Sequence, residues 1–272
     1  MSKERQFNKL LKQFYTSSNR NYLPWRKTHD PYKILISEVM LQQTQVSRVE
    51  SKFEPFVERF PTVEILAKAD LAEVLSRWSG LGYNRRAKYL HQCARKIVGK
   101  HNSQISKHIS ELIVLPGVGE ATAGAIVVYA YNVAEIFIET NIRRAIIDYF
   151  FSDKNAVHDK HIKLILKDVI DRNNPREWYW SLVDYGASLG KVKNNPNKKS
   201  VHYTKQTLFL GSKRQVRGSV IKLLVQDIII SEDNLKRSIE GDQKYLKEVL
   251  KELVSEGLID KSGQKYRLST GR

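Results

Sequence analysis

The chain has 272 residues, 41% of them hydrophobic, and its 46 Lys and Arg against 29 Asp and Glu give a formal net charge of +17. This fraction of hydrophobic residues is sufficient for a hydrophobic core and excludes global disorder. The lack of any apolar run near ~18 residues excludes a membrane span. The single cysteine, Cys93, excludes a disulfide framework and a four-cysteine zinc or iron–sulfur site. The positive charge favours a polyanionic partner, most simply nucleic acid, although a generally basic protein without such a partner would show it too.

The longer, N-terminal part of the sequence predicts one helix after another, because apolar residues recur at helical spacing between helix-ending signals. Pro31 stands where a helix can begin, Thr62 is a candidate N-cap after Pro61, and Gly80 and Gly82 interrupt the pattern. No alternating strand pattern is convincing, so we expect this part to be all-α. The expected helices cover residues 33–53, 63–69, 71–78, 85–98, 105–114, 120–131, 141–151, 160–171 and 178–189.

A basic segment separates this part from the rest of the chain. Residues 185–226 contain no Asp or Glu, and the polar, turn-rich stretch 191–199 lies in their middle. That pattern indicates a linker or a phosphate-facing loop. We therefore expect three parts: a helical domain over residues 1–190, a basic linker over 191–212, and a small domain over 213–272.

The C-terminal part predicts three helices followed by a β-hairpin. The helices cover residues 217–226, a short stretch from Ser231, and 242–256, and the hairpin covers 258–268 with its turn at Ser262 and Gly263. This order resembles a winged helix, which can place its third helix in the major groove of DNA or can bind another protein. The third helix carries both lysines and glutamates, so both interpretations stay open.

A glycine-containing turn joins two of the expected helices. The string Leu-Pro-Gly-Val-Gly-Glu-Ala-Thr-Ala covers residues 115–123, and Gly117 and Gly119 let the backbone approach a ligand closely just before a helix N-terminus. Free N–H groups and the positive end of the helix dipole suit a DNA phosphate there, although a simple helix–helix turn is the plain alternative. The full string resembles the helix-hairpin-helix of DNA glycosylases related to endonuclease III and to the MutY-type adenine glycosylases. The resemblance makes Gly117, Val118 and Gly119 DNA-binding residues.

Further motifs in the same order extend this resemblance over roughly residues 20–190. The matching segments are residues 23–26, 31–46, 60–62 and 78–87, followed by Val-Tyr-Ala-Tyr-Asn at 128–132 and Phe-Ile-Glu-Thr-Asn-Ile-Arg-Arg at 137–144. They look most like the MutY-type adenine DNA glycosylases. The implied fold is mainly α: a helix-hairpin-helix glycosylase fold with two helical lobes around a DNA-binding cleft, followed here by the small winged-helix-like α+β domain.

The resemblance also implies the residues that carry the chemistry. Cleaving an N-glycosidic bond leaves positive charge on the sugar and needs a proton on the departing base, so one carboxyl group held protonated and one ionised carboxylate suit the reaction. By resemblance Glu38 is the acid and Glu139 the stabilising carboxylate. Tyr131 would shape the site, and Asn141 would orient water or a carboxylate. Taken alone, each glutamate would be read as a solvated helix charge and Tyr131 as a core residue.

Three departures from the family pattern qualify these expectations. The second carboxylate is normally an Asp, and Glu139 reaches one methylene further, which favours a compensating backbone shift, slow cleavage or a different substrate. Ala121 stands where the lyases of the family carry a Lys, so no Schiff base can form there. The four cluster cysteines are absent, so we expect no iron–sulfur cluster and no cofactor requirement, with a hairpin-bound monovalent cation possible by resemblance.

The expected partner is double-stranded DNA with a mispaired or damaged base, which must be flipped out before any chemistry. Gln42 and Tyr83 match positions that wedge into the duplex in the family, and a basic residue beside them, Arg86, would suit the phosphate backbone. Lys198 and Lys199 of the basic loop would take over contacts of the missing cluster. Because the chain has one cysteine and its first residues lack a secretory apolar run, we expect a cytoplasmic, nucleoid-associated monomer without a membrane partner.

These observations favour a monofunctional DNA glycosylase of base excision repair that removes adenine mispaired with guanine or 8-oxoguanine by hydrolysis. Related mismatch glycosylases share much of the segment 37–44, so a thymine or uracil glycosylase of the same fold is the close alternative. A non-catalytic DNA-binding protein with a degenerate site is the alternative from another class, because Glu139 replaces the usual Asp.

Overall fold

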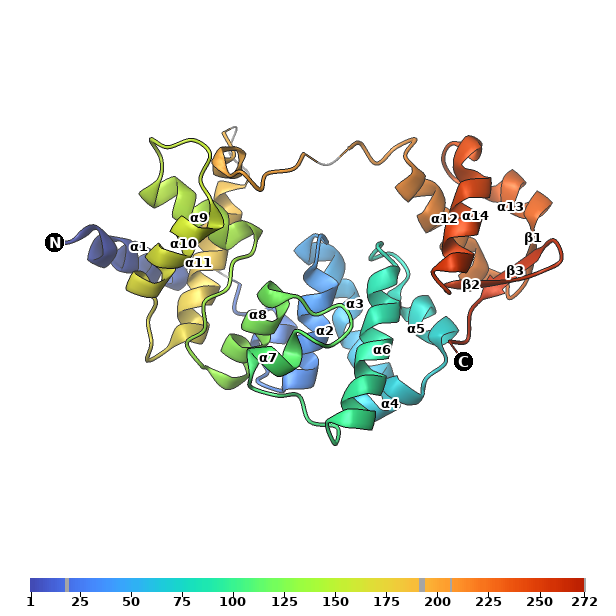
Figure 1. Cartoon of the computed structure of the whole chain (residues 1–272), viewed down its shortest axis with the longest axis horizontal. Helices are drawn as coiled ribbons and strands as arrows, with labels where there is room; N and C mark the ends of the chain where they lie inside the picture. The colour runs from blue at the N-terminus through green and yellow to red at the C-terminus, as the bar shows by residue number, and fades with distance from the viewer. Residues whose placement is uncertain (18–19, 191–193, 206, 272) are drawn as a thin grey trace. The chain divides into compact units, whose positions relative to one another are not determined.

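In the computed structural model the described residues are 1–17, 20–190, 194–205 and 207–271, and they form a mainly helical protein with one small sheet (Figure 1). The chain divides into two compact units, and each unit consists of three separate segments of the sequence. The first unit comprises Met1–Leu35, Ser106–Ile113 and Val118–Lys205, and the second comprises Ile36–Ile105, Val114–Gly117 and Gln206–Arg272. No helix of the described residues has both the length and the apolar character that crossing a membrane requires.

The first unit contains one helix that is buried on nearly all sides. This helix, α8, has buried residues at every position from Thr122 to Ala130, so neighbouring helices must cover its whole circumference. The elements of this unit are α1 (Lys3–Ser17), η1 (Pro24–Arg26), α7 (Ile109–Leu112), α8 (Glu120–Tyr131), α9 (Thr140–Phe150), α10 (Asp159–Val169), α11 (Pro175–Leu189) and η2 (Pro196–Lys199).

Helices α9 and α11 pack against each other closely. A Cβ atom at Gly186 in α11 would overlap the carbonyl oxygen of Asn141 in α9, so only glycine allows this approach. A buried ion pair also ties the end of η1 to α11: Arg26 donates two hydrogen bonds to Asp184, at 2.7 and 2.8 Å. The close contact at Gly186 thus holds the first turn of α9 against α11.

The second unit begins inside a helix and ends with the C-terminal elements. Its first part contains the last residues of α2 (Pro31–Leu41), then α3 (Val46–Arg59), α4 (Val63–Lys68), α5 (Leu71–Trp78) and α6 (Arg85–Lys100). Phe56, Phe60 and Trp78 form an edge-to-face aromatic cluster with ring centroids 4.9 and 5.9 Å apart. All three side chains are buried, so this cluster is the core between α3 and α5.

The C-terminal elements belong to the same unit as α3–α6. They are α12 (Lys213–Gln226), β1 (Ile230–Ser231), α13 (Glu232–Ser238), η3 (Gln243–Tyr245), α14 (Leu246–Ser255), β2 (Ile259–Ser262) and β3 (Lys265–Leu268). The strands form an antiparallel sheet in the order β1-β3-β2, with Ile230 opposite Tyr266 and Ile259 opposite Leu268. Leu71 N–H donates to the Thr270 carbonyl at 3.0 Å, so the end of the sheet is joined to the start of α5.

Several expected elements differ from the structure. The single helix expected over 33–53 is wrong, because the chain turns at 42–45, where Gln43 adopts a left-handed φ of 54° and Thr44 N–H bonds to the Leu41 carbonyl. The helix expected over 105–114 contracts to α7, and α1 is not among the helices expected from the sequence. The expected hairpin gains a third strand, β1. The winged-helix assignment and the domain borders at 190 and 212 stay predictions, and residues 191–193 and 206 of the expected linker lie outside the described residues.

Candidate active site and nucleic-acid interface

In the first unit, Glu139 forms the N-cap of α9. Its Oε1 accepts hydrogen bonds from the backbone N–H groups of Asn141 and Ile142, each at 2.8 Å, and its Oε2 accepts one from Nδ2 of Asn141 at 3.2 Å. The carboxylate thus occupies the positive end of the helix dipole and satisfies two N–H groups that have no partner within the helix. The longer side chain of glutamate, in place of the family's aspartate, still reaches both backbone donors.

Asn141 links this carboxylate to an arginine. Arg144 Nη1 donates to Oδ1 of Asn141 and to the Gly186 carbonyl, both at 2.8 Å, and its Nε donates to Oδ1 of Asn195 at 3.0 Å. The amide of Asn141 is therefore fixed with its nitrogen toward Glu139 and its oxygen toward Arg144. The structure brings these two predicted site residues together, and it adds Arg144, a residue of the 137–144 motif for which the sequence predicts no role.

Opposing influences set the proton affinity of Glu139. Burial raises the pKa of this carboxyl above its ordinary value, whereas the two backbone N–H donors and the guanidinium groups of Arg144 and Arg143 act to lower it. Burial is the largest of these influences. A carboxyl group under such opposing influences is a candidate for a functional role, although N-cap carboxylates also occur as purely structural features.

Tyr131, the third predicted residue of the first unit, is the last residue of α8. It is half-buried, and burial together with the charge of Asp30 raises the pKa of its phenol. The next residue, Asn132, closes the helix in the left-handed conformation with φ 54°, and its Oδ1 accepts the backbone N–H of Arg176 at 3.1 Å. Asparagine tolerates this conformation better than most residues, so it can close the helix here.

The second unit holds the other predicted carboxyl group. Glu38 lies in the last two turns of α2 and is half-buried, with the buried residues Ser37 and Val39 on either side. Four residues further on, the chain enters the turn at 42–45 that follows α2. Glu38 and the predicted duplex wedge Gln42 are thus carried by one short stretch of backbone.

The hairpin turn contacts this stretch. Gln42 Nε2 donates to the Gly117 carbonyl at 3.3 Å, within the second unit. Gly117 has a φ of 77°, and a Cβ atom there would lie 2.8 Å from Cβ of Tyr89, so the position requires glycine for two reasons. Val118 buries its side chain, and Gly119 is the exposed N-cap of α8 with no atom within 4 Å of a Cβ built on it. The turn therefore leaves space for a ligand at Gly119.

The guanidinium of Arg86 is buried, so it is not placed to bind a DNA phosphate as predicted. Its residue is only 8% exposed, and its guanidinium donates hydrogen bonds to the carbonyls of Val39 (2.8 Å) and Met40 (2.9 Å) and to Oγ1 of Thr44 (2.8 Å). It also donates to the carbonyls of Leu81 (3.2 Å) and Gly82 (3.1 Å). With these acceptors the group faces the protein interior. Arg86 instead joins the end of α2 to the turn before α6.

Tyr83 stays at the surface beside this buried group. It is 38% exposed, has a left-handed φ of 46°, and its ring centroid lies 5.5 Å from the Arg86 guanidinium carbon. Its hydroxyl accepts a hydrogen bond from Nη1 of Arg214 at 3.0 Å. The predicted wedge residue is therefore in contact with the C-terminal elements, which the sequence did not reveal.

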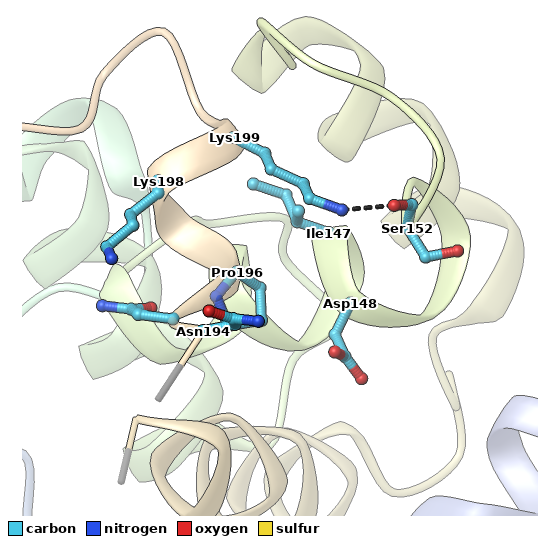
Figure 2. A pocket seen from close by; sticks show the side chains of 8 residues that line it. Ile147, Asp148, Ser152, Asn194, Pro196, Lys198 and Lys199 are labelled. Carbon is cyan, nitrogen blue, oxygen red and sulfur yellow. Dashed lines mark hydrogen bonds between the residues drawn. The ribbon is translucent and has the colours of Figure 1, made fainter. Parts of the chain in front are cut away.

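Lys198 and Lys199, the two predicted lysines of the basic loop, are the last residues of η2. They line a cavity of about 390 Å³ in the first unit (Figure 2). The remaining lining residues are Ile147, Asp148, Ser152, Asn194, Asn195 and Pro196. Lys199 points across the cavity and donates to the Ser152 carbonyl, whereas Lys198 points to the other side of η2 and is exposed. Lys198 is thus the freer of the two for a phosphate, and the DNA contact of both stays a prediction.

The residues of this chain do not fit an iron–sulfur cluster. Cys93 is its only cysteine; it is buried in α6, and burial raises the pKa of its thiol to about 12, so it is not a thiolate at neutral pH. Among the described residues no group of three or more His, Cys, Asp or Glu is arranged to hold a metal ion. The expected hairpin-bound cation stays a proposal.

Comparison with known proteins identifies the family. A family model described as HhH-GPD superfamily base excision DNA repair protein matches residues 36–172. The adenine DNA glycosylase of Mycobacterium tuberculosis (strain CDC 1551 / Oshkosh) is 33% identical over 244 residues, which cover 78% of this chain and 76% of that protein. The chain belongs to the HhH-GPD superfamily. The family resemblance read from the motifs, and the mainly helical helix-hairpin-helix fold that it implies, are confirmed.

Two further comparisons define how far the similarity to HhH-GPD proteins extends. The adenine DNA glycosylase of Buchnera aphidicola subsp. Baizongia pistaciae is 34% identical over 194 residues, or 70% of this chain and 54% of that protein, so the chain spans about half the length of this relative. A solved structure of a thermostable thymine-DNA glycosylase aligns with a TM-score of 0.64 at 25% identity, covering 72% of this chain and 92% of that chain.

Proposed function

We propose that this chain is a monofunctional DNA glycosylase of base excision repair that excises adenine mispaired with guanine or 8-oxoguanine. The observation that carries the proposal is the match to a relative named adenine DNA glycosylase that extends over 244 residues. The family model matches residues 36–172, which include both candidate carboxyl groups. The proposed partner is double-stranded DNA, bound by a monomer.

The proposed reaction is hydrolysis of the N-glycosidic bond of a flipped nucleotide. Glu38 gives its proton to the departing base, and the bond's electron pair leaves with that base. The ionised carboxylate of Glu139 stabilises the positive charge that develops on the sugar, and Asn141 keeps this carboxylate oriented. Water then adds to the anomeric carbon and releases a proton. Tyr131 shapes the site, and Gln42 and Tyr83 wedge into the duplex. The hairpin backbone at 117–119 binds a phosphate. The proposal includes a monovalent cation bound by the hairpin carbonyls.

The product is proposed to be an intact abasic strand. Ala121 lies in the first turn of α8, directly after the hairpin, and offers only a methyl group where a lyase needs an amine. A strand cleaved only after alkali treatment is therefore the expected product. Neither an iron–sulfur cluster nor another cofactor is required in this proposal.

A second candidate is excision of thymine or uracil opposite guanine. The structural match to a thymine-DNA glycosylase over 92% of that chain is the observation that favours it. In this case the roles of Glu38 and Glu139 stay the same and only the pocket for the base differs.

Single-turnover excision on duplexes with A:G, A:8-oxoguanine, T:G and U:G pairs, with matched duplexes as controls, tests the proposal. Each reaction is analysed with and without alkali. Cleavage of the adenine strand only after alkali supports the proposal, and cleavage at T:G or U:G overturns the substrate but not the mechanism. The Glu38→Gln variant should bind the same duplexes and excise nothing. If wild type binds tightly and leaves every duplex intact, the chain is a non-catalytic DNA-binding protein.

A further inference from the structure

Three consecutive apolar side chains are exposed just before α12. Leu208, Phe209 and Leu210 are 87%, 56% and 80% exposed, respectively. The turn that carries them is held by hydrogen bonds: Ser212 Oγ donates to the Phe209 carbonyl at 2.6 Å, and Gly211 N–H donates to Oε1 of Gln215 at 2.8 Å. A continuous exposed apolar group on a fixed turn marks an interaction site more often than a single exposed residue does. We call residues 208–210 the apolar turn.

One arginine joins this turn to the predicted duplex wedge. Arg214 Nη2 donates to the Thr207 carbonyl at 2.7 Å, and its Nη1 donates to the Tyr83 hydroxyl at 3.0 Å. A single planar guanidinium therefore holds Tyr83 and the residue immediately before the apolar turn. The apolar turn and the wedge tyrosine belong to one continuous surface of the second unit.

The charge around this surface favours a polyanion. The neighbouring cations of α12, Lys213 and Arg217, pair with glutamates in or directly after α14, whereas no carboxylate of the described residues pairs with Arg214. The guanidinium has five N–H groups and uses two of them in the contacts above, so others can meet a phosphate. The sequence from 185 to 226 also contains no Asp or Glu.

We propose that the apolar turn inserts against the bases of double-stranded DNA beside Tyr83, while Arg214 binds the adjacent phosphate. Apolar wedges of Leu and Phe between base steps are a common means of holding distorted DNA, and cationic contacts to phosphate supply salt-dependent affinity. This inference rests on the proposed function, because it needs a duplex distorted at Tyr83. It assigns the C-terminal elements a part in substrate binding.

The double variant Leu208→Ser/Phe209→Ser tests the wedge. The matched control is Ile228→Ser/Ile229→Ser, because these residues are equally exposed, at 85% and 56%, on the other connection of α12. Binding is measured by fluorescence anisotropy on a duplex that contains a stable abasic analogue. The turn variant should bind about tenfold more weakly than wild type, as expected for the loss of a stacking contact, and the control should bind like wild type.

A second variant tests the cation. Arg214→Ala should weaken binding to every duplex and reduce the slope of log affinity against log salt by about one, the change expected for one lost phosphate contact. An unchanged slope would contradict the phosphate contact. Equal binding by the turn variant and its control would overturn the wedge, as would a wild-type self-association that Leu208→Ser/Phe209→Ser abolishes without any loss of DNA affinity.

Failure of this inference is distinguishable from failure of the proposed function. If wild type excises adenine and the turn variant binds and excises like the control, only the wedge is wrong. If wild type excises no base but the turn variant still loses affinity for the abasic duplex, the wedge stands and the proposed function falls.

Discussion

The two units place opposite charges at opposite helix ends. In the first unit the carboxylate of Glu139 caps the N-terminus of α9, where the N–H groups and the helix dipole are positive. In the second unit the guanidinium of Arg86 meets the carbonyls of Val39 and Met40 at the C-terminus of α2, where the dipole is negative. Each charge matches its helix end, so dipole complementarity alone does not tell which of them is catalytic.

The difference lies in what the charge can still do. Arg86 is enclosed by five acceptors, and although burial lowers its pKa to about 10, it stays protonated at neutral pH. Glu139 is only half-buried as a residue, so part of it stays accessible, and burial raises the pKa of its carboxyl. The comparison indicates that the charge of Arg86 is structural and that the charge of Glu139 is available for chemistry. The following variants test that distinction.

The largest effect is expected from Glu139→Gln. The amide oxygen can still accept the backbone N–H groups of Asn141 and Ile142, but the negative charge that stabilises the sugar cation is gone. We expect excision to slow about a thousandfold, equivalent to about 4 kcal/mol of transition-state stabilisation, in single-turnover assays. The free energy of unfolding should fall by only about 1 kcal/mol, the usual value of an N-cap.

Glu139→Asp is the matched control, because aspartate keeps the charge and is a favoured N-cap residue. Its excision rate should stay within about tenfold of wild type, since the displacement of the carboxylate is the only change. A Glu139→Gln variant as active as wild type would show that this carboxylate is structural, like Arg86.

The main effect expected of the Arg86→Ala variant is a loss of stability, not a direct loss of excision activity. Truncation leaves the carbonyls of Val39, Met40, Leu81 and Gly82 without this donor in a buried place. We expect the free energy of unfolding in urea to fall by about 3 kcal/mol. Arg85→Ala is the control, because the Arg85 side chain is 59% exposed, and it should change stability by less than about 0.5 kcal/mol. Equal losses for the two variants would contradict the structural role of Arg86.

The comparison also shows what the sequence could and could not reveal. The motif order predicted the family, and apolar spacing, prolines and glycines predicted most of the N-terminal helices, because these are local signals. The role of Arg86 was missed because its partners lie on α2 and on the turn before α6, and no local pattern records that a guanidinium points inward. The motif Gly-Leu-Gly-Tyr-x-x-Arg at 80–86 was the available signal.

A long-range contact explains one further missed feature, and an unusual local turn explains another. The C-terminal elements read correctly as helices and a hairpin, yet their contact with Tyr83 through Arg214 depends on residues 131 positions apart. The break in the helix expected over 33–53 has a local cause, the left-handed Gln43, but glutamine is a residue that sequence patterns do not associate with such a turn.

A steric change in the first unit tests whether α11 positions the Asn141 amide. In Gly186→Ala the new methyl group would overlap the Asn141 carbonyl oxygen, so α9 must shift away from α11. We expect a loss of about 2 kcal/mol in the free energy of unfolding, typical of overpacking, together with slower excision. The control Gly218→Ala lies inside α12 with no atom within 4 Å of its Cβ, and it should stabilise the protein by about 0.5 kcal/mol. A Gly186→Ala protein as stable as wild type would contradict this packing.

The smallest expected effect concerns the ion pair beside Glu139. Arg143 donates two hydrogen bonds to Asp159, at 2.7 and 2.8 Å, and this contact holds the pKa of Asp159 below its ordinary value. A lowered carboxyl pKa means that the ionised form stabilises the folded protein, so the contribution is present at neutral pH and is lost as the pH falls through the lowered pKa. Asp159→Asn should therefore cost about 0.5–1 kcal/mol at pH 7, a value that allows for solvent screening of a partly exposed pair.

The pH dependence of that cost provides the stricter test. The difference in unfolding free energy between wild type and Asp159→Asn should shrink in acid, below about pH 4, where the wild-type carboxyl also becomes neutral. Asp153→Asn is the control, because Asp153 and its neighbour Lys154 are 73% and 66% exposed and should contribute nothing measurable at either pH. A difference that stays constant from pH 7 into acid would mean that Asp159 acts through packing. In that case Arg143, which also lowers the pKa of Glu139, would be held in place without the help of this charge.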